Sequence, residues 1–200
     1  MLNKIIAVYS YYKLYKPFNI LSQFSDEGNK RGLGSFLNLP QDVYPIGRLD
    51  SDSEGLLLLT NNRTLTNQIL DPRNRHVRSY LVQVEGEFTD DAIERIQAPM
   101  ALKHKKTRYV SLPAVAEKIE EPSLPDRNPP IRFRANIPTS WIRLQLREGK
   151  NRQVRKMTAA VGFPTLRLVR ESMEGIGVEG MESGQLVELE EQEFLRLLNL

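Results

Sequence analysis

Residues 47–60 read GRLDSDSEGLLLLT, and this stretch determines how the rest of the chain is interpreted. Two apolar segments flank its polar centre, residues 43–46 (VYPI) and residues 56–59 (LLLL), and each is short enough for a buried strand rather than a helix. The turn between them carries three carboxylates. A carboxylate on a loop between two buried strands is held by the scaffold yet open to a ligand, so Asp50 is the first candidate catalytic residue.

The same turn admits two simpler interpretations. Asp, Ser and Gly are ordinary turn formers, so composition alone explains the stretch equally well as a plain loop. Its spacing, Asp50-x-Asp52-x-Glu54-Gly55, also imitates the opening of an EF-hand calcium loop. The calcium interpretation is disfavoured, because the twelfth position is Asn61 rather than a bidentate glutamate and the leucines before it favour burial.

The composition limits the class of protein. The chain has 200 residues, of which 40% are hydrophobic, so it can build one large domain or two small ones. It contains no cysteine, which excludes disulfides, thiolate metal sites and cysteine nucleophiles. Its start holds too short an apolar run for a signal peptide, and no later run approaches a membrane span. We therefore expect a cytoplasmic protein with no membrane partner.

The net charge of +3 conceals a strong asymmetry. Residues 127–170 contain eleven lysines or arginines and one acidic residue, whereas residues 171–200 contain eight acidic residues and one arginine. Such a basic block within an otherwise neutral chain is typical of a protein that binds a polyanion. A solvated basic face is the alternative.

Apolar spacing and breaker residues predict the elements along the chain. Strands are expected at residues 11–15, 19–24, 43–46, 56–59, 78–86, 109–110, 115–119, 142–146, 163–170 and 185–189. Helices are expected at residues 33–39, 62–70, 89–97, 151–161 and 191–198. An exposed loop with four prolines is expected at residues 120–130. Trp141, Phe133 and Ile137 should be buried, and His76 and His104, which lack ligand partners at metal spacing, should face RNA or solvent.

Two further stretches carry candidate functional residues. Residues 78–86, RSYLVQVEG, alternate as a half-buried strand that holds Tyr80, for which a core aromatic is the simpler interpretation. Residues 148–157, EGKNRQVRKM, lead into a helix that places Arg152, Arg155 and Lys156 on one face. Cations in a first helical turn oppose the helix dipole, so this face favours a bound anion such as phosphate, although a surface helix with a basic face is the alternative.

Together these stretches resemble the motifs of the pseudouridine synthases that modify ribosomal RNA, in the branch of the small-subunit enzyme and the B, E and F large-subunit enzymes. Residues 47–60 are similar to the family's catalytic motif, and Asp50 matches its nucleophile. Arg78-Ser79-Tyr80 is similar to a second motif, usually Lys-x-Tyr, which implies that Tyr80 lies against the target base. Arg155 matches the residue that pairs with the catalytic aspartate, and a nearby guanidinium would favour its nucleophilic anion.

The resemblance implies an α/β fold of the α+β type, with a mixed, mostly antiparallel sheet, flanking helices and a central RNA-binding cleft. The chain is most similar to the E type, which has no N-terminal S4-like domain. Residues 1–200 are therefore expected to form one catalytic domain, either undivided or with two subdomains flanking the cleft. No cofactor or metal is expected, because the isomerisation involves no redox change and no Walker loop or dinucleotide fingerprint is present. The expected substrate is 23S ribosomal RNA, and a monomer is the default.

Polar residues near the motifs are candidates for binding the RNA. They are Arg48, Arg78, Lys150, Asn151, Arg152, Lys156 and Arg167, with Arg170 as a further phosphate candidate. Two other functions use the same residues. A ribosome assembly factor could bind ribosomal RNA without chemistry, and a metal nuclease could use Asp50, Asp52 and Glu54.

Overall fold

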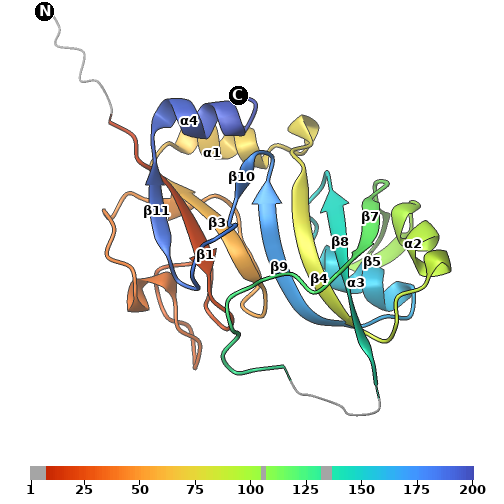
Figure 1. Ribbon diagram of the computed structural model, residues 1–200. Coiled ribbons are helices and arrows are strands. Elements are labelled where there is room, and N and C mark those ends of the chain that lie inside the picture. The colour runs from red at the N-terminus through yellow and green to blue at the C-terminus, as the bar shows by residue number, and fades with distance from the viewer. Residues whose placement is uncertain (1–7, 105–106, 132–136) are drawn as a thin grey trace, which may run out of the picture.

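The computed structural model describes residues 8–104, 107–131 and 137–200 (Figure 1). Within these ranges one sheet has nine strands: β1 (Tyr11–Lys16), β2 (Tyr44–Pro45), β3 (Glu54–Thr60), β4 (Arg78–Glu85), β7 (Val115–Ile119), β8 (Thr139–Leu146), β9 (Thr165–Met173), β10 (Ile176–Gly177) and β11 (Leu186–Leu189). A separate hairpin pairs β5 (Ala101–His104) with β6 (Thr107–Val110). The helices are α1 (Arg63–Leu70), α2 (Asp90–Gln97), α3 (Gln153–Ala160) and α4 (Glu191–Leu197), with 3-10 turns η1 (Leu33–Ser35) and η2 (Pro72–Asn74). The expected α+β fold is confirmed.

The large sheet consists of two antiparallel halves joined by a short parallel seam. Its order is β11-β1-β3-β9-β4-β8-β7, with β2 on β3 and β10 on β9. Among the described strands only β3 and β9 pair in parallel, through Glu54 with Val169 and Gly55 with Arg170. A Cβ atom on Gly55 would overlap main-chain atoms of Arg170, so this close approach of the two halves requires glycine.

The hydrophobic core is continuous on one face of the sheet and divided on the other. On the first face one cluster crosses the seam, joining Leu58 of β3 to Val169 of β9. On the opposite face, Leu57 and Leu59 of β3 belong to a cluster separate from that of Tyr80 on β4. Successive residues of a strand point to opposite faces, so the LLLL run supplies both layers. The halves are thus held together from one side and leave a gap on the other.

Two polar side chains cap the starts of helices α1 and α2. The Asn62 side chain accepts from the N–H of Leu65 at the start of α1, and the Thr89 side chain accepts from the N–H of Ala92 at the start of α2. None of the helices in the described ranges is long and apolar enough to cross a membrane.

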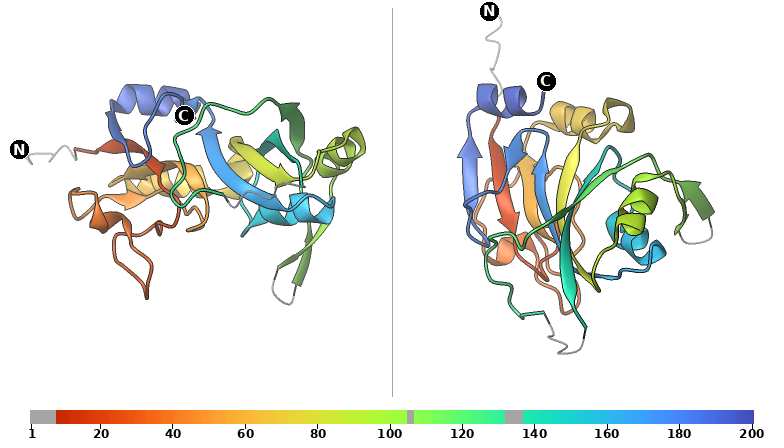
Figure 2. Two further views of the ribbon diagram at one scale, coloured as in Figure 1. Left: turned by 60° about the horizontal axis from the view of Figure 1, so that its bottom comes forward. Right: turned by 45° about the vertical axis from the view of Figure 1, so that its right-hand side comes forward.

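A long connection covers the continuous face of the sheet. Residues 120–130 leave β7 and cross in front of β4 and β9 toward the other half of the molecule (Figures 1 and 2). Leu124 packs on the cluster that spans the seam, and the carbonyl of Pro125 accepts from Arg167 at 2.7 Å. The predicted proline-rich loop therefore lacks regular structure, but its contacts with the core cluster and with Arg167 stabilise the seam.

Several sequence predictions are wrong. Residues 19–24 form no strand, because they fold against the loop that carries Asp50, and the helix expected at residues 33–39 is reduced to η1. Ile137 is exposed, whereas Trp141 is buried as expected; Phe133 lies outside the described residues. His76 is buried, with Nδ1 3.4 Å from Oε1 of Glu174, so it faces neither RNA nor solvent; the side chain of His104 is not described.

Candidate active site

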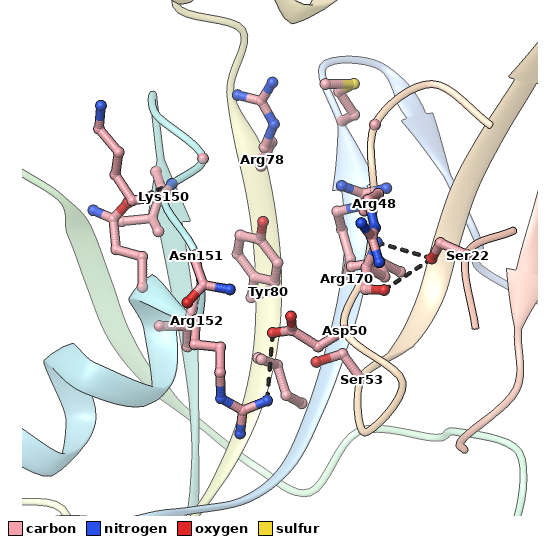
Figure 3. Close-up of a pocket in the computed structure, with 18 of the residues that line it drawn as sticks. Ser22, Arg48, Asp50, Ser53, Arg78, Tyr80, Lys150, Asn151, Arg152 and Arg170 are labelled. Carbon is pink, nitrogen blue, oxygen red and sulfur yellow. Dashed lines mark hydrogen bonds and ion pairs between the residues drawn. The ribbon is translucent and has the colours of Figure 1, made fainter. Parts of the chain in front are cut away.

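A pocket of about 710 Å³ opens on the divided face of the sheet, beside the core cluster that contains Tyr80 (Figure 3). One wall is the loop of residues 46–53 that precedes β3. The opposite wall is residues 148–154, which comprise the turn after β8 and the first two residues of α3, and the floor comes from β4 and β9. Its size is typical of a ligand site, and its position places the seam of the fold directly beneath it.

The main chain on both sides of Asp50 is fixed by the segment that follows β1. The Ser22 hydroxyl donates to the Leu49 carbonyl at 2.8 Å and accepts from the Leu49 N–H at 3.0 Å. The N–H of Asn19 donates to the carbonyl of Ser51 at 2.7 Å. The carboxylate itself remains 32% exposed and faces the pocket (Figure 3). Asp50 is therefore held rigidly at its backbone while its side chain stays accessible.

Arg152 is the cation nearest to Asp50 among the described residues. Its Nη1 lies 3.6 Å from Oδ2 of Asp50, and its two Nη atoms donate to the two carboxylate oxygens of Asp52 at 2.8 Å each. Arg152 precedes α3 with φ 52°, a left-handed conformation that is uncommon for a non-glycine residue. The backbone strain and the bidentate pair together aim the guanidinium across the pocket.

Arg155 contacts Asp52 rather than Asp50, which corrects the pairing expected from the sequence. Its Nη2 donates to the main-chain carbonyl of Asp52 at 2.6 Å, and its Nε lies 3.4 Å from Oδ2 of the same residue. Burial raises the pKa of Asp52, but the hydrogen bonds from Arg152 and the charge of Arg155 lower it by more, so the pKa lies below its ordinary value. Two arginines therefore clamp the turn that carries Asp50.

Glu54 and Arg167 form a buried ion pair at the seam. Arg167 donates from Nε and Nη2 to the Glu54 carboxylate at 3.0 and 2.8 Å. Both side chains are almost completely buried, and Arg167 does not line the pocket, so its expected contact with RNA is corrected. The three carboxylates proposed for a metal nuclease do not converge, because Glu54 points into this pair.

Lys16, at the end of β1, is fully buried beside the seam. Its Nζ donates to the carbonyls of Pro17 and Ile20 at 2.8 Å each, which closes the turn containing Asn19. Burial lowers the pKa of Lys16 to about 7, although the charges of Glu54, Asp52 and Asp50 act in the opposite direction. Lys16 thus fixes the turn whose Asn19 N–H is bound to Ser51 of the Asp50 loop.

Comparison with known proteins identifies the family. The family model described as RNA pseudouridylate synthase matches residues 10–160, a span that includes Asp50, Tyr80 and Arg155. The chain belongs to the RNA pseudouridylate synthase family. The predicted enzyme class, a pseudouridine synthase, is confirmed.

Curated relatives place the chain near one branch of these synthases. It is 45% identical over 174 residues to the ribosomal large subunit pseudouridine synthase E of Vibrio vulnificus, covering 87% of this chain and 72% of the relative. It is 48% identical over 160 residues to the E synthase of Xanthomonas axonopodis pv. citri, covering 78% and 82% of the two chains. The B synthase of Bacillus subtilis is 35% identical over 188 residues, or 94% of this chain and 70% of the relative.

A solved structure supports the fold. A crystal structure of a pseudouridylate synthase superposes with a TM-score of 0.78 over 96% of this chain and 75% of that chain, at 22% sequence identity. At that identity the likeness establishes the fold alone. It agrees with the mixed sheet described above.

The synthase brings together most of the residues expected from the sequence. Seven of them line the pocket: Arg48, Asp50, Arg78, Tyr80, Lys150, Asn151 and Arg152. Arg155 and Lys156 do not line it; Arg155 clamps the Asp50 turn, and Lys156 donates from Nζ to the carbonyl of Asn151 at 2.6 Å. Both act on the wall of the pocket rather than on its contents.

Sequence reasoning missed three other polar lining residues, Ser22, Lys30 and Ser53. Arg170, which the sequence offered as a phosphate candidate, also lines the pocket but is buried. Arg170 donates from Nε to the carbonyl of Leu56 at 2.7 Å, so it links the halves below the pocket. Lys30 donates from Nζ to the Ser51 hydroxyl at 2.9 Å. No local pattern around Lys30 or Ser22 could have found them, because their contacts depend on the fold of residues 17–32.

Proposed function

We propose that this chain converts a specific uridine of 23S ribosomal RNA into pseudouridine, with Asp50 as the nucleophile. The observation that carries the proposal is a half-exposed carboxylate on a fixed loop, facing a pocket whose rim holds Arg48, Arg78 and Lys150. The names of the relatives, which are ribosomal large subunit synthases, support the choice of RNA.

The uridine must leave its stack before it can react, because C1′ and C6 are inaccessible within a helix. Asp50 attacks one of these two carbons, the bond from C1′ to N1 breaks, and the uracil rotates within the pocket. A bond from C1′ to C5 then forms, the proton lost from C5 is balanced by one gained at N1, and the carboxylate is released. The reaction is an isomerisation and needs no oxidant, reductant or group donor.

Tyr80 is the proposed platform for the extruded base. It lies on β4 at the floor of the pocket, across from Asp50 (Figure 3). Its aromatic ring can pack on uracil in the manner of many sites that bind unstacked bases. Arg155 is proposed to assist through Asp52, by holding the turn in place, and Arg152 supplies the positive charge beside Asp50.

The rim cations are proposed to bind phosphates on either side of the target nucleotide. Arg48 and Lys150 are exposed, and neither side chain has an ion-pair partner among the described residues. Asn151 and Arg152 complete this rim. The chain is further proposed to act as a single catalytic unit over residues 1–200, as a monomer and in the cytoplasm, where it would meet naked ribosomal RNA or a precursor particle.

Carbodiimide mapping of pseudouridines in ribosomal RNA from cells with and without this protein tests the substrate. We expect one pseudouridine of 23S RNA to disappear and to return with the wild-type chain. Asp50→Asn should abolish its return, because the amide keeps the shape but is no nucleophile. Asp52→Asn, the same change two residues away, should leave measurable turnover. An unchanged map would refute the choice of RNA, and turnover by Asp50→Asn would refute the nucleophile.

A further inference from the structure

Arg170 is a buried arginine that has no counter-charge in the fold. It lies within β9, is 6% exposed and lines the floor of the pocket. Among the residues that the structure describes, no carboxylate pairs with its guanidinium. The buried Arg167, three residues earlier, is by contrast paired with Glu54. Burying a cation without a counter-charge is costly, so its presence at the floor of a pocket requires an explanation.

The strand register places Arg170 directly beside Tyr80. The two residues are cross-strand partners of β9 and β4, so both side chains leave the same face of the sheet, with Cβ atoms about 4.5 to 5.5 Å apart. That face is the one on which the pocket opens, because Leu168, two residues before Arg170, belongs to the core cluster of Tyr80. Figure 3 shows both side chains at the pocket, Tyr80 from β4 and Arg170 from β9. A base that packs on the Tyr80 ring is therefore placed within reach of Arg170.

One end of the Arg170 guanidinium is fixed by the main chain. Its Nε donates at 2.7 Å to the carbonyl of Leu56 on β3, across the seam. Burial lowers the pKa of Arg170, the Tyr80 hydroxyl acts in the opposite direction, and the charge of Arg78 lowers the pKa further. An arginine nevertheless stays protonated in a protein. The cation is thus held at a defined position, with its remaining donors facing Tyr80 and the pocket.

The proposed reaction places negative charge on the uracil whichever carbon Asp50 attacks. Attack at C6 moves an electron pair of the C5–C6 double bond toward the C4 carbonyl, which becomes an enolate. Attack at C1′ breaks the bond from C1′ to N1, and its electron pair leaves with the uracil, which shares the charge between its ring and its carbonyl oxygens. In both routes C5 then donates a pair to C1′, which removes the charge. A cation beside a carbonyl oxygen of the base would stabilise charge that exists only during the reaction.

We propose that Arg170 is a further catalytic residue, which contacts a carbonyl oxygen of the uracil that lies on Tyr80 and stabilises the negative charge that develops there. This inference rests on the proposed function for the reaction and for the position of the base. Burial strengthens such a contact, because water does not screen the charge. The inference also accounts for the missing counter-charge, since a resident carboxylate would cancel the charge of Arg170.

Single-turnover kinetics with two RNA substrates test the proposal. Each is 23S ribosomal RNA assembled by ligation, with either uridine or 5-fluorouridine at the mapped position, because fluorine at C5 stabilises the uracil anion. Arg170→Gln removes the charge but keeps an N–H that can reach the Leu56 carbonyl. With uridine, consumption of the target nucleoside at saturating enzyme should slow about 10²- to 10³-fold, the usual effect of one lost contact to a developing anion. With 5-fluorouridine the loss should be about tenfold smaller, because that anion needs less stabilisation.

The matched control is Arg143→Gln, which removes an arginine charge from β8 on the opposite face of the same sheet. It should leave both rates unchanged. Arg170→Lys keeps the charge with fewer donors and should recover part of the rate with uridine. Urea denaturation and RNA affinity check that each variant is folded and bound. If Arg170→Gln does not fold, the two substrates are compared with Arg170→Lys, whose loss should again be smaller with 5-fluorouridine.

Three results would overturn the role of Arg170. Equal losses with the two substrates would mean that it only shapes the pocket, and an unchanged rate with uridine would mean that its charge is not used. Weaker RNA binding with an unchanged rate at saturation would make it a binding contact. In each case turnover by the wild type leaves the proposed function standing. A wild type that converts neither RNA would instead refute the proposed function, and this inference with it.

Discussion

Asp50 and Glu54 lie four residues apart in one stretch but occupy opposite environments. The Glu54 side chain is 3% exposed and accepts two hydrogen bonds from Arg167. The Asp50 side chain is 32% exposed, and its nearest described cation, Arg152, is 3.6 Å away and bound to Asp52 instead. Both carboxylate oxygens of Glu54 are thus hydrogen-bonded within the fold, whereas the carboxylate of Asp50 remains available to a substrate.

The difference follows from the position of each residue relative to the seam. Glu54 is the first residue of β3, where β3 meets β9 and the chain is enclosed on both faces. Asp50 precedes the strand, where the core is divided and only the main chain is held. The backbone that carries a reactive group must be fixed. Here Glu54, whose carboxylate is fully hydrogen-bonded, fixes the chain next to Asp50. The buried Glu54–Arg167 pair, the closed pair, should therefore determine stability. The exposed Asp50 carboxylate should determine the rate of the reaction.

The largest expected effect comes from breaking the closed pair. Glu54→Gln leaves the Arg167 guanidinium buried without a counter-charge, which should lower the free energy of unfolding by about 3 to 5 kcal/mol. Glu54→Leu/Arg167→Met, which removes both charges, should recover most of that loss. Urea denaturation measures both variants against Asp50→Asn, whose loss should stay below about 1 kcal/mol because its ion pair is exposed. Equal losses at positions 50 and 54 would contradict the comparison.

Local patterns predicted the parts of this arrangement that depend on near neighbours in sequence. The alternation of β4, the helical spacing of α1 and α2 and the LLLL strand all follow from local chemistry. Asp50 and its loop were found because a motif of consecutive residues carries them. The fold class followed from the same motifs.

Long-range partners could not be predicted in this way. Arg152 and Arg155 lie in the same helical motif, and the left-handed backbone of Arg152 decides which of them lies nearer to Asp50. Arg167 was expected to contact RNA because it is a cation in a basic block, yet its partner Glu54 is 113 residues away. Residues 19–24 have strand-like composition, but the hydrogen bonds of Ser22 to Leu49 hold them as a loop. In each case a contact formed by the fold outweighed the local preference.

A smaller effect is expected from Lys16, which like Glu54 is buried and which contacts no carboxylate among the described residues. Its pKa of about 7 lies below the ordinary value of 10.5, so between these values the unfolded chain binds a proton that the folded chain does not. Stability should therefore rise with pH in this window. From about pH 7 to about pH 9 the wild type should gain roughly 2 kcal/mol relative to Lys16→Met. Urea denaturation at several pH values gives this difference, and a constant difference would show that Lys16 is charged in the fold.

The smallest expected effects distinguish Arg152 from Arg155, the two arginines that hold the Asp50 turn. Double-mutant cycles should give a coupling of about 1 kcal/mol between Arg155 and Asp52 and less than that between Arg152 and Asp50, because the second pair is longer and more exposed. The cycle with Asp52→Ala reports only the side chain, since the bond from Arg155 to the main-chain carbonyl of residue 52 survives the substitution.

The cycle between Arg155 and Asp50 decides which arginine serves the nucleophile. If Arg155 acts only by holding the turn through Asp52, its coupling to Asp50 in urea denaturation should be indistinguishable from zero. Arg155→Ala should then slow turnover by misplacing Asp50, and Arg155→Lys should restore part of the rate, since the ammonium can reach the same carbonyl with one donor instead of a fork. A coupling to Asp50 larger than that to Asp52 would mean that Arg155 pairs directly with the nucleophile, and Arg152 would then be left as a contact for Asp52 alone.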